Sequence, residues 1–201
     1  MMTSRHCNTW RLLLIGSLTW LLAGCASFSS REIIVDAIND PALTPGLSYR
    51  LVSRVNPALS TRGEPLDNKA VAYVKAALAT RGWFEAPEKV KPDMIVEMEY
   101  GVGAPQPSVS FGTVREKYLQ LLARRYREDA RARQPGEELW SVKVSVEERS
   151  ANIEPCLPAL ATVAGDYSGL NTITQKRIMV SDSDPAVMLV KQAVPAPAGR
   201  K

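Results

Sequence analysis

Alternation of apolar and polar residues predicts two strands in the middle of the chain. The clearest covers Asp93–Val102, where Met, Val and Tyr residues take every second position. A second strand follows at residues 140–147, which read WSVKVSVE. Because each strand has one apolar and one polar face, both are expected to belong to a sheet that buries one of its faces.

Helical spacing of apolar residues predicts two helices. The first begins with Asp67 or Asn68 as its cap and ends near Arg81, with Gly82 well placed as the left-handed residue after it. Its apolar stripe consists of Val71, Val74 and Leu78, flanked by Ala70 and Ala77. The second predicted helix covers Pro155–Gly165.

Weaker patterns fill most of the remaining chain. Tyr49–Val55 is compatible with a strand, Arg177–Val180 with a final strand, and Ile33–Val35 with an edge strand inside a polar segment. Prolines and glycines predict loops at residues 57–65 and 104–112. Asp184-Pro185 predicts a turn into a short segment, residues 186–192.

Residues 115–133 fit two interpretations. Their composition favours a helix, yet Leu119, Leu121 and Ala123 also alternate as in a strand. The turn signal Gln134-Pro135-Gly136 comes directly afterwards and is followed by the strand at residues 140–147. This order favours a long hairpin.

The predicted order of elements is therefore strand, helix, three strands, helix, strand. Each helix has one apolar stripe and the sheet has one apolar face. The economical arrangement is an α/β (α+β) fold: a two-layer domain with a mixed or antiparallel sheet and two helices packed on one face. A single domain is expected over residues 46–194, with a frayed tail at 195–201.

Composition agrees with a folded domain. The hydrophobic fraction of 45% and the charged fraction of 23% exclude a wholly disordered chain and a polytopic membrane protein. The net charge of +4 is small and mixed in sign, so no nucleic-acid partner is predicted.

Residues 1–24 have the pattern of a signal peptide. Arg5, His6 and Arg11 form a basic segment, and the uncharged, mostly apolar run Leu12–Leu22 follows. As a helix this run would rise about 16 Å, roughly half the thickness of a hydrocarbon core. It is therefore too short to span a membrane.

The run ends in Leu22-Ala23-Gly24-Cys25, which resembles the lipobox of bacterial lipoprotein signal peptides. The resemblance implies cleavage between Gly24 and Cys25 and lipidation of Cys25 with three acyl chains. Ala26 and Ser27 follow in place of Asp, which by the same resemblance favours the periplasmic face of the outer membrane. Residues 25–45 would then be the lipidated cysteine and a tether.

Loss of residues 1–24 would also remove reactive groups. His6 is the single histidine, and Cys7 would leave with it. Lipid would occupy Cys25, so Cys156 would be the remaining thiol. Histidine-based catalysis, a Cys/His zinc site and an intramolecular disulfide are then excluded, and no catalytic, cofactor-binding or metal-binding residue is predicted.

Carboxylates and the remaining thiol are the main chemical candidates. Glu97 and Glu99 lie on one strand face with Cα atoms about 6.7 Å apart, a pairing that can serve glycoside hydrolysis. The alternative, which the alternation favours, is the wet face of an amphipathic strand. Cys156 is either a reactive thiol at a helix start or a small buried residue, and the lack of histidine favours the second.

Two further clusters have simple structural explanations. The arginines at 124, 125, 127, 131 and 133 suit anionic headgroups, but Glu128 and Asp129 interrupt them and favour a solvated hairpin. Asp182 and Asp184 have the spacing of a metal pair, although Pro185 favours a turn. Trp83 and Trp140 are expected in the core, one in each layer.

Four segments carry a resemblance to a known group. They read ALATRGW from Ala77, KPDMIVEMEYGVG from Lys91, LWSVKVSVEE from Leu139 and CLPALATVAGDYSGLNT from Cys156. Together they resemble an uncharacterised family of bacterial envelope lipoproteins carrying a domain of unknown function. The resemblance runs from Gly46 to Val180 and implies a lipobox, a small α/β domain and no assigned activity.

These observations predict a lipid-anchored outer-membrane lipoprotein that faces the periplasm and has a non-catalytic binding or scaffolding role. The membrane is the expected partner through the anchor, and another envelope protein is the second. Two alternatives stay open: an accessory lipoprotein of an envelope transport or assembly machine, and a cell-wall hydrolase that uses carboxylates.

Overall fold

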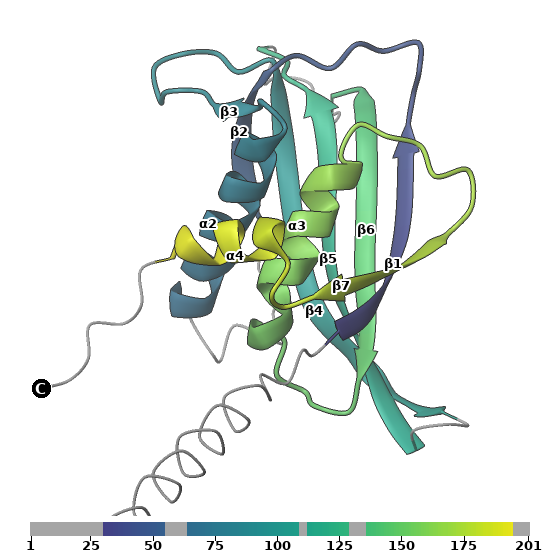
Figure 1. The fold of residues 1–201 in the computed structure, drawn as a ribbon. Helices are drawn as coiled ribbons and strands as arrows, with labels where there is room; N and C mark the ends of the chain where they lie inside the picture. The colour runs from purple at the N-terminus through teal and green to yellow at the C-terminus, as the bar shows by residue number, and fades with distance from the viewer. Residues whose placement is uncertain (1–29, 55–63, 109–111, 129–135, 195–201) are drawn as a thin grey trace, which may run out of the picture.

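The computed structural model describes residues 30–54, 64–108, 112–128 and 136–194 (Figure 1). The predicted signal peptide, the lipobox with Gly24 and Cys25, and the tail at 195–201 lie outside the described residues. The elements are β1 (Ser30–Asn39), β2 (Ser48–Ser53), α2 (Glu64–Thr80), β3 (Phe84–Glu85), β4 (Met94–Ser108), β5 (Gly112–Arg125), β6 (Glu138–Glu148), the 3-10 helix η2 (Glu154–Cys156), α3 (Leu157–Tyr167), β7 (Lys176–Ser181) and α4 (Pro185–Gln192).

The strands form one mixed seven-stranded sheet in the order β3-β2-β4-β5-β6-β1-β7. β4, β5 and β6 form an antiparallel meander, and β1 pairs antiparallel with both β6 and β7. β2 runs parallel to β4, so the chain between them makes a crossover that contains α2. The α/β class predicted from the sequence is confirmed.

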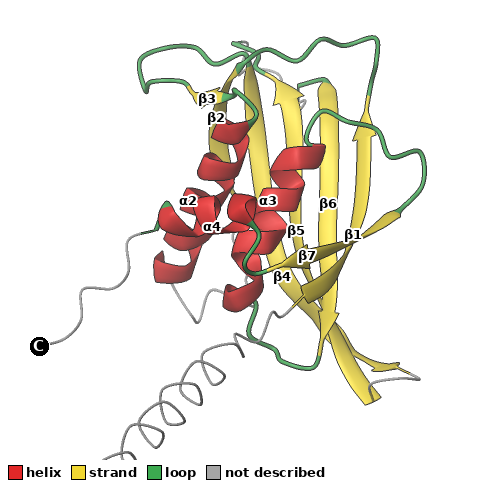
Figure 2. Ribbon diagram, in the orientation of Figure 1, coloured by secondary structure: helices red, strands yellow, loops and turns green. Residues whose placement is uncertain are grey.

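Burial alternates along the central strands, as the sequence pattern predicts. Leu119, Leu121 and Ala123 of β5 are fully buried on the face that packs against α3. Figure 2 shows the helices gathered on this side of the sheet. We call the other side the open face; its side chains include Glu97, Glu99, Tyr118, Gln120 and Lys143, all exposed or half-buried.

The helices form the second layer. α3 packs against β1, β5 and β6, and also against α2 and α4. α2 and α3 approach closely at Gly165, where an added Cβ would lie 2.9 Å from the Cβ of Ala77. Trp83 and Trp140 stack with ring centroids 5.0 Å apart, so one aromatic pair joins the end of α2 to the sheet.

Most of the predicted elements are confirmed. Residues 115–125 and 138–148 form the hairpin β5–β6, the helix interpretation of residues 115–133 is wrong where the chain is described, and both predicted helices are present. The number of helices needs correction, because residues 185–192, predicted only as a short segment, form α4. Its Val187 and Val190 are buried, which gives this third helix its own apolar face.

The beginning of the domain also needs correction. Residues 30–39 were predicted as tether with an edge strand, but β1 lies between β6 and β7 inside the sheet. Ile33, Val35 and Ala37 alternate toward the buried face, and the apolar Ile34 and Ile38 on the other face hide this alternation in the sequence. The folded domain therefore begins at or before Ser30, not at residue 46.

Two boundaries differ for local reasons. α2 begins at Glu64, so Asp67 is no cap; inside the first turn its carboxylate accepts a hydrogen bond from Ser53 Oγ at 2.5 Å. β4 extends to Ser108 through part of the predicted loop, and its register with β5 shifts between Val102 and Pro105. Prolines are tolerated there because the ladder with β2 covers only residues 94–98 of β4, which leaves the later part with one partner strand.

Candidate functional site

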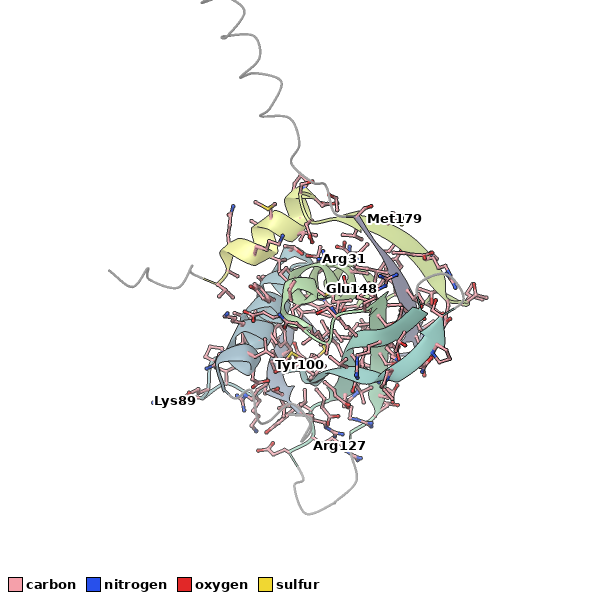
Figure 3. All side chains as sticks on the ribbon, turned by 90° about the horizontal axis from the view of Figure 1, so that it is seen from below. Arg31, Lys89, Tyr100, Arg127, Glu148 and Met179 are labelled. Atoms are coloured by element: carbon pink, nitrogen blue, oxygen red, sulfur yellow. The ribbon has the colours of Figure 1, made fainter. Side chains whose placement is uncertain are left out.

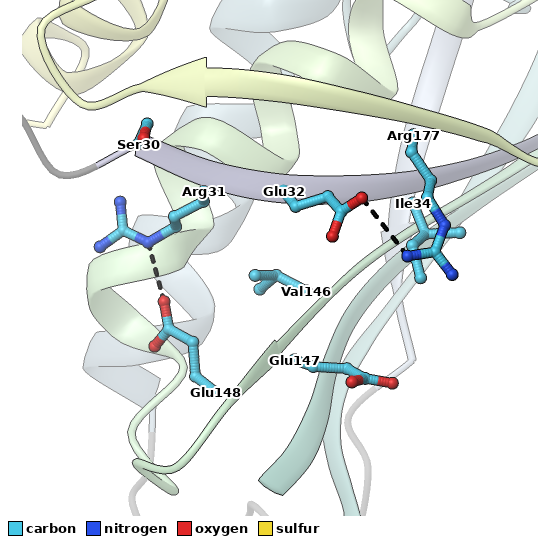
Figure 4. A pocket seen from close by; sticks show the side chains of 8 residues that line it. All are labelled: Ser30, Arg31, Glu32, Ile34, Val146, Glu147, Glu148 and Arg177. Atoms are coloured by element: carbon cyan, nitrogen blue, oxygen red, sulfur yellow. Dashed lines mark hydrogen bonds and ion pairs between the residues drawn. The ribbon is translucent and has the colours of Figure 1, made fainter. Parts of the chain in front are cut away.

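A hollow opens where β1 and β6 separate. Their ladder ends at the pair Ile34 and Ser145, although β1 continues back to Ser30 beside β7 and β6 continues to Glu148 beside β5. The gap is a hollow of about 290 Å³ (Figure 4). It is lined by Ser30, Arg31, Glu32, Ile34, Val146, Glu147, Glu148 and Arg177.

Arg31 bridges the two sides of the hollow. Its Nε donates to Glu148 Oε1 at 2.9 Å, and its NH1 group donates to Asp182 after β7. Figure 4 shows the first of these contacts spanning from β1 to the end of β6. One guanidinium therefore joins β1 to the end of β6, where these two strands share no ladder, and also to the turn after β7.

Glu148 is shared with a second cation, the buried side chain of Lys117. Lys117 Nζ lies 2.5 Å from Glu148 Oε2, and its side chain is only 1% exposed. Burial alone raises the pKa of Glu148, but the hydrogen bonds from Lys117 and Arg31 outweigh this and hold it below its usual value. The carboxylate is therefore charged at neutral pH and compensates a buried ammonium group.

Cys156 completes this cluster on the helix side. Its Sγ lies 3.5 Å from Lys117 Nζ, and the residue is fully buried at the start of α3. Burial raises the pKa of the thiol, and the charge of Glu148 raises it further. A thiol in this state is a poor nucleophile, which agrees with the buried alternative considered for Cys156.

The outer side of the hollow carries a weaker ion pair. Arg177 NH1 lies 3.3 Å from Glu32 Oε1, and both side chains are at least half exposed. Such exposed pairs contribute little stability. The hollow thus combines paired surface charges with two strand edges that have no ladder partner there among the described strands, features suited to binding a polar segment.

The predicted carboxylate pair is placed on the open face, away from this hollow. Glu97 Oε2 lies 2.8 Å from Arg54 NH2, and Glu99 accepts a hydrogen bond from Tyr118 Oη at 2.9 Å. Both carboxylates thus have partners of their own. This geometry supports the wet strand face rather than a hydrolytic pair.

The predicted arginine cluster does not form one basic patch within the described residues. Arg124 lies 3.9 Å from both Glu97 and Glu138, and Arg125 lies 3.2 Å from Glu137. Arg127 follows the strand, while residues 131 and 133 lie outside the described residues. Arg124 and Arg125 are therefore each close to acidic side chains on the neighbouring strands or on the turn before β6.

Asp182 and Asp184 also have separate structural roles. Asp182 accepts from Arg31, and Asp184 caps α4 by accepting from Ala186 N at 2.9 Å. Among the residues that the structure describes, no cluster of His, Cys, Asp and Glu suits a metal ion. Within the same residues, no helix has the length and apolar character needed to cross a membrane.

Sequence reasoning missed the cluster of Arg31, Lys117 and Glu148. One signal was available: Lys117 precedes Leu119 and Leu121 in the alternation, so it occupies a position on the buried face. A lysine at such a position needs an acidic partner. The sequence does not indicate which acid supplies it, because Glu148 belongs to a different strand.

Comparison with known proteins shows similarity of fold only. No protein-family model and no curated protein matches the chain. A PDZ domain protein from Parabacteroides distasonis is similar with a TM-score of 0.50 and 9% identity, over 81% of this chain and 42% of that one. A PelC dodecamer from Paraburkholderia phytofirmans has a TM-score of 0.40 and 11% identity, over 66% of this chain and 94% of that one.

Proposed function

We propose that this chain is a lipid-anchored lipoprotein on the periplasmic face of the outer membrane, with a non-catalytic binding or scaffolding role. The observation that carries the proposal is the position of Cys25. It ends a lipobox-like sequence and lies only five residues before Ser30, where the folded domain is already present. An acylated cysteine there would hold the domain directly at a membrane surface.

A binding role is supported by the open face of the sheet. Its charged side chains form a lattice of pairs, such as Lys143 with Glu116 at 2.9 Å, rather than converging on a reacting centre. Gln120 lies at the middle of this face, opposite Glu99 on β4 and Lys143 on β6. A partner with a complementary polar surface can replace these exposed ion pairs with contacts of its own, and little stability is lost because exposed pairs contribute little.

A non-catalytic role is supported by the state of the candidate reactive groups. Cys156 is buried with a raised pKa, and Glu97 and Glu99 are each held by a neighbouring side chain. Catalytic groups need access to substrate. The buried thiol lacks that access, and each of the two carboxylates already has a side-chain partner.

The anchor is tested by the intact mass of the chain extracted from separated inner and outer membranes. We expect a chain that begins at Cys25, carries three acyl groups and is found in the outer-membrane fraction. A soluble chain, or one not cleaved before Cys25, would refute the lipoprotein assignment.

The binding face is tested by site-specific photo-crosslinking in cells. A photoreactive residue at Gln120 is expected to give a defined adduct, while the same residue at Lys89, in an exposed loop before β4, is not. The charge reversal Lys143→Glu should abolish the Gln120 adduct. Equal adducts from Gln120 and Lys89 would show that the open face has no specific partner.

A further inference from the structure

Large apolar side chains are exposed beside the first residues of β1. Met179 of β7 is 66% exposed, and Met188 and Leu189 of α4 are 43% and 55% exposed. Figure 3 shows α4 and Met179 on the same rim of the molecule. We call Met188 and Leu189 the rim patch; Met179 is next to the buried Val180 and therefore points to the other face of β7.

Backbone pairing places the end of β7 next to Ser30, and α4 follows β7 in the chain. In the ladder of β1 with β7, Ser30 pairs with Ser181 and Glu32 pairs with Met179. α4 begins at Pro185, immediately after the turn that follows β7. The patch is therefore attached to the same end of the domain as the start of β1.

The orientation of α4 is held by its inner face. Val187 and Val190 are buried, so Met188 and Leu189 point away from the core. Lys191 Nζ also donates to the carbonyl oxygen of Asp182 at 3.1 Å, which ties the helix back to the turn before it. The exposed apolar face of α4 is thus a fixed surface of the fold.

The number of residues between Cys25 and Ser30 limits how far this surface can lie from a lipid anchor at Cys25. Five Cα–Cα steps connect Cys25 to Ser30, and they span at most about 19 Å in any conformation. α4 itself is about 12 Å long. A lipid anchor at Cys25 would hold the rim patch within reach of the bilayer interface.

We propose that the rim patch binds the bilayer itself, with Met188 and Leu189 inserted at the boundary between headgroups and acyl chains. The proposal rests on the lipid anchor at Cys25 proposed above. An amphipathic helix with outward Met and Leu side chains binds such an interface through its buried apolar area. The anchor supplies the proximity, and the patch sets the orientation of the domain on the membrane.

The test places a fluorescent probe on the native lipidated chain in phosphatidylethanolamine and phosphatidylglycerol vesicles. Leu189→Cys is labelled with the polarity-sensitive dye NBD, and Met188→Cys serves as a repeat. The matched control is Ile173→Cys, because Ile173 is 92% exposed but lies away from the Ser30 end of β1. Its neighbour Thr172 donates a backbone hydrogen bond to Ala37, which is seven residues further along β1 than Ser30. Cys156 is buried, so the parent chain provides the labelling blank.

We expect the Leu189 probe to shift to shorter wavelength and to be quenched several-fold more strongly by doxyl-labelled lipids than the Ile173 probe. Equal quenching of the two probes on acylated protein would overturn the rim-patch proposal while the anchor stands. A shift that depends on protein concentration without quenching by lipid would identify a second copy as the occupant and also overturn it. If the mass shows no acylation of Cys25, the proposed function fails first, and this inference fails with it.

Discussion

Glu148 is expected to be the acidic residue on which the buried charge cluster depends. It compensates Lys117, whose side chain is 1% exposed, and also binds Arg31, whose side chain is 14% exposed. The substitution Glu148→Gln keeps the size and a hydrogen-bonding oxygen but removes the charge. Lys117 would then remain buried without this carboxylate, with Cys156 Sγ 3.5 Å from its Nζ.

The size of the effect follows from the burial of the charges that remain. Breaking a buried ion pair by removing one partner costs about 3–5 kcal/mol. Glu148 itself is 28% exposed, so we expect about 3 kcal/mol, at the lower end of this range. For a domain of this size, that corresponds to a fall in Tm of about 6–12 °C.

The matched variant is Lys117→Met, which removes the buried cation and keeps a long apolar side chain. Glu148 then retains Arg31, so we expect the free energy of unfolding to change by about 1 kcal/mol or less. Combining Lys117→Met with Glu148→Gln should recover much of the loss caused by Glu148→Gln alone. Glu137→Gln, which disrupts an exposed pair with Arg125, is the surface control and should cost about 0.5 kcal/mol or less.

Urea unfolding of the four variants at pH 7 measures these differences. Lowering the pH should reduce the difference in the free energy of unfolding between the parent and Glu148→Gln. The folded pKa of Glu148 is lowered, so its stabilising charge is fully present above the usual pKa of glutamate and is lost as the pH falls through the folded value. Equal stability of parent and Glu148→Gln at pH 7, or an equal loss in Lys117→Met, would refute this account of the cluster.

Three further predictions follow from close packing and burial. Gly165→Ala should lower the free energy of unfolding by about 1–3 kcal/mol, because its Cβ would collide with Ala77; a denaturation curve that matches the parent would contradict this. Burial raises the pKa of Tyr49 and of Tyr100 to about 12, so the stability they provide is present below pH 10 and lost as the pH rises toward 12. Absorbance at alkaline pH should show these tyrosines ionising late and together with unfolding, and early ionisation would count against their burial. Cys156 should react with a thiol reagent only in denaturant, and rapid reaction of the folded chain would be inconsistent with its position.

The central strands could be predicted because their side chains alternate between a buried face and an exposed face of the sheet. Alternation in residues 94–102 and 140–147 reports which face is buried, and the structure repeats that pattern with little change. The hairpin interpretation of residues 115–133 depended on the turn signal before β6. It was correct because β5 pairs with strands on both sides, which favours strand over the helical tendency of its residues.

Long-range partners explain what could not be predicted. The apolar residues of β1 do not alternate cleanly, and its place inside the sheet depends on ladders with β6 and β7, more than 100 and 140 residues away. The charge cluster has the same property, since Arg31, Lys117 and Glu148 come from three different strands. A single sequence can show that Lys117 needs a partner, but the fold decides which carboxylate meets it.

The position of β1 has a mechanical consequence. A pull on the N-terminal segment enters the described domain at Ser30, where β1 is bonded to β7, and from Ile34 onward β1 is also bonded to β6. A pull directed along the strand would stretch the hydrogen bonds of both ladders at once, in shear. Those bonds would share the load instead of breaking one after another, as they would if an edge strand were peeled away. We therefore expect a pull from the N-terminal side to unfold the domain only when several of these hydrogen bonds break together.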